Sequence, residues 1–90
     1  MTTRLNLKAL ATQVSERGIM TGEISGDREA AYIQGKSYLM RIGLFGIDTF
    51  TAEVFDKSSY ETITEISAPT KTNIDTALEK IESMANGIKI

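Results

Sequence analysis

The sequence predicts an α+β fold, in which an antiparallel β-sheet is covered on one face by N-terminal and C-terminal amphipathic helices. Apolar residues recur every three or four positions near both ends of the chain, whereas the middle of the chain alternates with a period of two. A length of 90 residues, with 41% apolar and 24% charged residues, is typical of one folded domain. We therefore expect a single α+β domain over residues 1–90, with three to five strands between the helices.

The first helix is predicted over residues 4–17. Thr2 or Thr3 is expected to cap its first amides, and Gly18 is expected to end it in the left-handed conformation. The apolar stripe that faces the sheet consists of Leu7, Leu10, Ala11 and Val14.

Residues 19–34 allow two interpretations. Ser25–Arg28 suits a tight hairpin turn, and the overlapping segment Asp27–Ala31 equally suits the start of a helix. We favour strands, because Gly35 and Gly43 would each weaken a helix over residues 28–44 by about 1 kcal/mol relative to alanine.

A strand is predicted over residues 38–45, and it is expected to be central because both of its faces are largely apolar. Thr49–Phe55 and Tyr60–Ile66 are expected to pair as a hairpin around the loop Lys57–Ser59. This register predicts a buried side made of Phe50, Ala52, Val54, Tyr60, Thr62, Thr64 and Ile66. The opposite side then holds Thr51, Glu53, Phe55, Glu61, Ile63 and Glu65.

The second helix follows Pro69. Thr72 and Asp75 form an imperfect capping box at its start, and Asn86-Gly87 is expected to end it. Its apolar stripe consists of Ile74, Ala77, Leu78, Ile81, Met84 and Ala85. Ile88–Ile90 alternates again and would add an edge strand, within the chain or across to a second copy, so we expect a homo-oligomer, most simply a homodimer.

The chain contains no cysteine, histidine or tryptophan. Cysteine and histidine supply many of the metal ligands, proton shuttles and activated nucleophiles of proteins, so we expect no enzyme, no catalytic residues, no metal and no cofactor. Residues 30–37 match a relaxed phosphate-loop pattern, but alanine replaces its first glycine and no nucleotide domain fits this length. We interpret Gly35-Lys36 as a turn between strands.

Charge is unevenly distributed along the chain. Residues 46–70 hold five acidic residues and one lysine, for a net charge of −4, whereas the first 45 residues carry +2 and the last 20 are balanced. An acidic hairpin repels phosphates and attracts a basic protein surface, so nucleic acid is not an expected partner. The N-terminus lacks an apolar run fit for a signal peptide, and no segment is apolar enough to span a membrane, so we expect a cytoplasmic protein.

These observations favour a non-enzymatic protein-binding module, whose partner is a larger protein with a basic or mixed surface. The expected contact residues are Glu53, Phe55, Glu61, Ile63 and Glu65, in which two apolar side chains are rimmed by carboxylates. Two simpler explanations for this pattern stay open, namely that the first helix or a neighbouring strand covers the face, or that the register is off by one.

Small acidic α+β proteins without cysteine are common among phage and mobile-element accessory proteins, so we expect an inhibitor of a host factor. The alternative function is a small-ligand or nucleotide-binding homo-oligomer with a pocket at the subunit interface. Its expected phosphate-binding residues are Arg28, Lys36 and Arg41.

Overall fold

A computed structural model of the protein describes residues 5–88, which form two helices and five strands. The elements in chain order are α1 (Leu7–Glu16), β1 (Glu23–Gly26), β2 (Ala30–Gln34), β3 (Tyr38–Phe45), β4 (Thr49–Asp56), β5 (Thr62–Pro69) and α2 (Ile74–Asn86). The strands form one antiparallel sheet in the order β1-β2-β3-β4-β5. The predicted α+β fold and the central position of β3 are confirmed.

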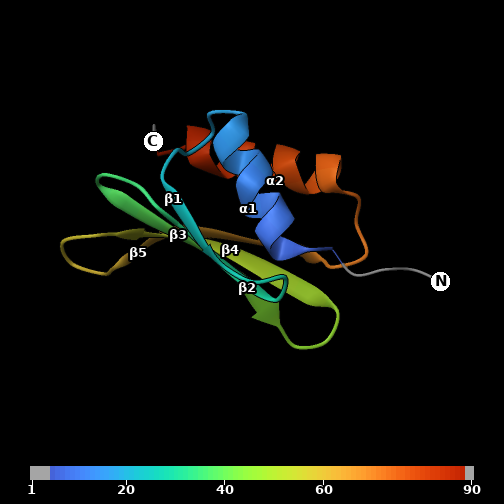
Figure 1. Ribbon diagram of the computed structural model, residues 1–90. Helices are drawn as coiled ribbons and strands as arrows, with labels where there is room; N and C mark the ends of the chain where they lie inside the picture. Colours follow the sequence, from blue (N-terminus) through green and yellow to red (C-terminus); the bar gives the residue numbers. More distant parts are fainter. Residues whose placement is uncertain (1–4, 89–90) are drawn as a thin grey trace.

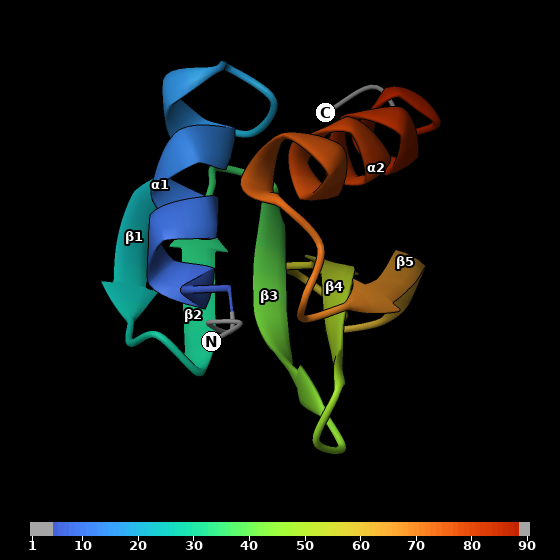
Figure 2. The same cartoon turned by 90° about the vertical axis from the view of Figure 1, so that its right-hand side faces the viewer.

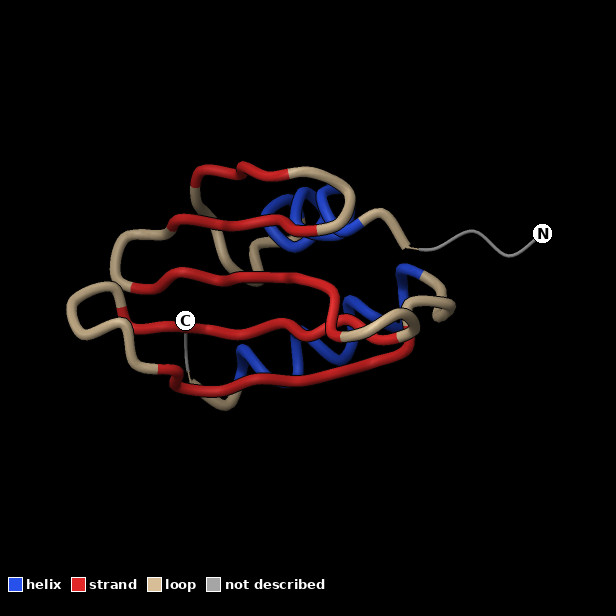
Figure 3. The backbone as a smooth tube through the Cα atoms, turned by 90° about the horizontal axis from the view of Figure 1, so that it is seen from below, coloured by secondary structure: helices blue, strands red, loops and turns tan. Residues whose placement is uncertain are grey.

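The molecule has two layers, with both helices on the same face of the sheet (Figures 1 and 2). Helix α1 packs on β1, β2 and β3, and α2 packs on β5 and against α1. Seen from the opposite side, the strands lie in front of the helices (Figure 3). The predicted coverage of one face by two helices is therefore confirmed, and the other face of the sheet is open within residues 5–88.

The helix stripes lie as predicted, but their N-terminal caps differ. Thr2 and Thr3 lie outside the described residues, and the cap of α1 is Asn6, whose side chain accepts hydrogen bonds from the amides of Lys8 and Ala9. Asn73, rather than Thr72, caps α2 by accepting a hydrogen bond of 2.8 Å from the amide of Thr76. In both places asparagine, which accepts from backbone amides more strongly than threonine, takes the cap position.

The helix ends agree with the prediction in position. Gly18 follows α1 with a φ of 72°, the left-handed conformation that glycine adopts at little cost. Helix α2 ends at Asn86, although Gly87 keeps a right-handed φ of −67°. The predicted C-terminal edge strand over residues 88–90 falls largely on residues outside the described part of the chain.

Strands β1 and β2 settle the ambiguous segment in favour of strands. The turn between them is closed by Asp27, whose carboxylate accepts hydrogen bonds from the amides of Glu29 and Ala30. Gly26 has a φ of 101°, and a Cβ atom there would collide with the carbonyl oxygen of Ala30. The predicted turn at Gly35-Lys36 between β2 and β3 is also confirmed.

The hairpin of β4 and β5 has the predicted faces but not the predicted register. Ala52 lies opposite Ile66 and Val54 opposite Thr64, so the even-numbered residues of β4 up to Val54 and of β5 from Thr64 face the helices. The observed register differs by two residues from the register that a Lys57–Ser59 loop would give. A bulge also lies between Val54 and Phe55. A two-residue displacement keeps the pleat in phase, so the predicted faces are correct from Thr64 onward, whereas the bulge places Thr62 opposite Phe55 on the open face.

Two residues of the predicted buried side leave it, namely Thr62, which is exposed beyond the bulge, and Tyr60. Tyr60 has a φ of 60° and is 72% exposed, because it belongs to the turn rather than to β5. The turn is organised by Asp56, whose side chain accepts hydrogen bonds from Ser58 and from the amide of Ser59. The hydrogen bond from the Ser58 hydroxyl, followed by the backbone hydrogen bonds, lowers the pKa of Asp56 below its usual 3.8.

The core lies between the sheet and the helices. Phe50 and Ile42 from the sheet, and Leu10 and Leu78 from the helices, are at most 1% exposed. Neither helix, within the described residues, is long and apolar enough to span a membrane. Because the core lies on the helix side of the sheet, the remaining side chains of β2 to β5 meet solvent on the opposite face.

Candidate protein-binding surface

The expected contact residues lie together on the open face of the β4–β5 hairpin and at the end of its turn. Glu53 and Phe55 belong to β4, and Glu65 lies directly opposite Glu53 on β5. Ile63 precedes Glu65 in the alternation of β5, and Glu61 immediately precedes that strand. We call these five residues the acidic face: Glu53, Phe55, Glu61, Ile63 and Glu65.

The apolar members of the acidic face differ in exposure. Ile63 is 41% exposed, which makes it an accessible apolar contact. Phe55 is half-buried, although no helix covers this side of the sheet. Its cross-strand neighbour on β3 is Leu39, also half-buried, so an apolar pair adjoins the exposed Ile63.

Its carboxylates are arranged unfavourably for the isolated protein. Glu53 and Glu65 occupy directly opposed positions on neighbouring strands, and like charges in such positions destabilise a sheet. On the other side of Glu53, Arg41 lies opposite it on β3, with Nη1 3.9 Å from Oε1, at the long limit of an ion pair. A row Arg41, Glu53 and Glu65 thus crosses three strands and carries a net charge of −1.

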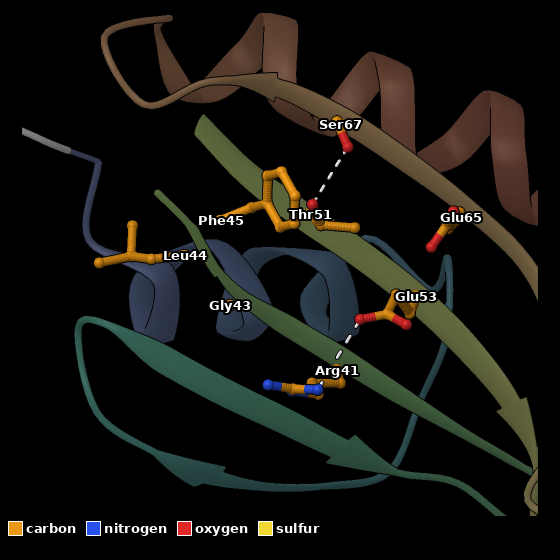
Figure 4. A pocket seen from close by; sticks show the side chains of 8 residues that line it. All are labelled: Arg41, Gly43, Leu44, Phe45, Thr51, Glu53, Glu65 and Ser67. Atoms are coloured by element: carbon orange, nitrogen blue, oxygen red, sulfur yellow. Dashed lines mark hydrogen bonds and ion pairs between the residues drawn. The ribbon is translucent and has the colours of Figure 1, made fainter. Parts of the chain in front are cut away.

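A hollow of about 320 Å³ adjoins this row on the open face (Figure 4). Its floor forms where Gly43, Thr51 and Ser67 follow one another across β3, β4 and β5, and the hydroxyls of Thr51 and Ser67 are 3.1 Å apart. Glycine and two short side chains leave room that longer residues would fill. The lining residues are Arg41, Gly43, Leu44, Phe45, Thr51, Glu53, Glu65 and Ser67.

Two exposed apolar residues that the sequence analysis did not assign to a site lie near this face, and one of them, Phe45, lines the hollow. Phe45 and Ile47, at the β3–β4 turn, are 74% and 71% exposed. The sequence signal for this exposed surface is the pair of apolar residues on either side of Gly46. Gly46 has a φ of 77°, which is typical of a turn, and turn residues are normally polar. The exposed apolar surface is therefore larger than the acidic face alone.

The residues proposed for phosphate binding are not brought together within one chain. Arg28 lies in the β1–β2 turn and Lys36 in the β2–β3 turn, at opposite ends of β2, whereas Arg41 lies on the open face of β3. Of these three cations, only Arg41 lines the hollow, where it shares the space with Glu53 and Glu65. These two carboxylates oppose binding of an anion in this hollow.

Chemically, the acidic face and the hollow offer ionised groups, hydroxyls and apolar surface. Among the described residues, no three acidic side chains converge as a metal site would need. Glu65 is exposed and Glu53 is partly exposed, so both are available to a partner's cations. The surface is suited to recognition by shape and charge.

Comparison of the chain with protein-family models found no match, and comparisons with curated proteins and with solved structures likewise found none.

Proposed function

We propose that the protein is a non-enzymatic binding module, which engages a larger protein of basic or mixed surface through the acidic face. The observation that carries this proposal is the opposed pair Glu53 and Glu65 beside exposed Ile63. A lysine or arginine of a partner placed between these carboxylates would relieve their repulsion, and burial of Ile63 would add apolar contact.

The charge distribution supports the same partner chemistry. Residues 46–70 carry a net charge of −4, whereas the whole chain carries only −2. The negative potential is therefore concentrated around the hairpin. Such a concentration accelerates encounter with a basic protein and disfavours phosphate-rich partners. More specifically, we propose that the protein is a phage or mobile-element accessory protein, which inhibits a host factor by occupying a basic functional surface of that factor.

The test compares two variants with the same change in net charge. Glu61→Lys with Glu65→Lys reverses the acidic face, and Glu16→Lys with Glu29→Lys reverses two exposed acidic residues outside it. A partner captured from host lysate is identified by mass spectrometry, purified and titrated against each variant. We expect the first variant to lose binding and the control to keep it. Equal binding by both variants would show that the contact lies elsewhere.

A further inference from the structure

Strand β5 forms one edge of the sheet (Figure 3). The hydrogen-bond pattern of the hairpin indicates which backbone groups of β5 do not pair with β4. The amide of Thr70 donates to the carbonyl oxygen of Asp48 at 2.7 Å, and these residues continue the register of the hairpin. Bonded and non-bonded pairs alternate along an antiparallel ladder. The inward-bonded residues of β5 are therefore Thr64, Ile66 and Ala68, and the backbone groups of Glu65 and Ser67 point away from β4.

The outward row ends in a residue without a donor. Pro69 lies in phase with Glu65 and Ser67, where its missing N–H costs no hydrogen bond to β4. At the other end, the bulge between Val54 and Phe55 interrupts regular pairing near Thr62. Between these limits, within residues 5–88, no strand pairs with the outer side of β5.

A second hollow of about 410 Å³ follows this edge between β5 and α2. An added strand would direct alternate side chains toward it and the others toward the acidic face. Its apolar surface comes from Ile66, which is partly buried, and from Met84, which is almost wholly buried. The lining residues are Ile66, Ser67, Lys80, Ser83 and Met84.

Charge decides between two occupants of the edge. A second copy pairing through β5 would bring two hairpins of net charge −4 together, with Glu65 on each β5 and Glu61 immediately before it. A strand with basic residues on the acidic-face side would instead place a cation beside Glu65. Complementarity thus favours a different protein over self-association.

We propose that the partner contributes an extended strand, which adds to the edge of β5 with basic side chains over the acidic face and apolar side chains toward α2. The backbone groups of Glu65 and Ser67 pair with it, as in other cases of strand addition. This inference rests on the proposed function and specifies the form in which the partner is bound.

The test uses a fluorescent, end-capped peptide of about seven residues in which lysine alternates with valine, a length typical of strands. Ser67→Pro removes an outward amide without touching the bonds to β4, and Ser67→Ala is its matched control, because both lose the hydroxyl that meets Thr51. Circular dichroism checks that both variants fold. A peptide with N-methylated amides, titrated against the unmodified protein, tests the same hydrogen bonds independently of any substitution.

Fluorescence anisotropy should show that Ser67→Pro binds the peptide roughly ten-fold more weakly than Ser67→Ala does, a difference of about 1.4 kcal/mol. The wild type should bind the N-methylated peptide more weakly than the unmodified peptide by a similar factor. A peptide of the same composition with lysines and valines in separate blocks should also bind more weakly. Equal binding of the peptide by Ser67→Pro and Ser67→Ala would overturn strand addition. So would a wild type that shows no binding at a peptide concentration of about 1 mM, which corresponds to a binding free energy weaker than about −4 kcal/mol.

Two further outcomes separate this inference from the proposed function. If strand addition fails but Glu61→Lys with Glu65→Lys still loses the captured partner, the acidic face stands and the partner binds in another form. If sedimentation shows a dimer that Ser67→Pro dissociates and Ser67→Ala does not, a second copy occupies the edge and the inference is wrong.

Discussion

The two faces of the sheet are built from alternate residues of the same strands, yet their composition follows different requirements. On β4, Phe50, Ala52 and Val54 face the helices and are wholly buried. On the other face, Thr51, Glu53 and Phe55 are partly exposed. The covered face is selected for packing, whereas the open face keeps a like-charge pair and exposed apolar residues, which stability alone would not favour. Stability and binding should therefore respond to substitutions on different faces.

The largest expected difference is between two phenylalanines of the same strand. Phe50→Ala should lower the free energy of unfolding by about 3–5 kcal/mol, because it empties a fully buried site. Phe55→Ala should cost roughly 1–2 kcal/mol, since its side chain is only half-buried. Urea denaturation measures both values. A larger loss at Phe55 would mean that the open face carries the core.

The next comparison uses one substitution at two glycines. Gly26→Ala should destabilise by about 1–3 kcal/mol, because its φ is 101° and the new Cβ would collide with Ala30. At Gly43, on the open face, the nearest atom to a new Cβ would be Nε of Arg41 at 3.8 Å. Gly43→Ala should therefore stabilise by about 0.5 kcal/mol. Thermal unfolding distinguishes the signs, and destabilisation at Gly43 would contradict the open hollow.

The like-charge pair provides a smaller test of the same comparison. Glu65→Lys places a cation opposite Glu53 and should raise the free energy of unfolding by about 0.2–1 kcal/mol. Glu23→Lys is the control, because Glu23 is an exposed strand residue opposite neutral Gln34 and should have little effect. Chemical denaturation at low salt measures both. If Glu65→Lys is the more destabilising, the repulsion on which the proposed function depends is absent.

The smallest expected effect is a pH dependence at the hairpin turn. The lowered pKa of Asp56 contributes stability that is present above its usual 3.8 and is lost as the pH falls through the lowered value. In Asp56→Asn this part of the acid dependence should disappear, so its unfolding free energy should fall less steeply below 3.8 than that of the wild type. Identical slopes would show that the turn does not depend on this carboxylate.

Periodicity predicted the elements and faces but not the pairing. Leu7, Leu10, Ala11 and Val14 identify α1 because a helix stripe is a local property, and alternation gives the faces of β4 and β5 in the same way. The two-residue displacement depends on Asp56 and its serine partners, whose hydrogen bonds compete with the ladder. Tyr60 was misplaced for this reason, and Thr62 was misplaced because of the bulge.

The same limit applies to the candidate site. The acidic face followed from parity along one hairpin, so its residues could be named from the sequence. The hollow requires Gly43, Thr51 and Ser67 to lie in one row across three strands. That row depends on the register between β3 and β4, which the pleat alone does not determine, since any displacement by two residues preserves the faces.

The most direct measurement determines stability and partner binding on a single preparation of Glu61→Lys with Glu65→Lys. If the two faces have separate roles, its melting temperature should equal or exceed that of the wild type while the captured partner no longer binds. Retained binding would contradict the assignment of the acidic face, and lost binding together with a lowered melting temperature would contradict the separation of the two faces.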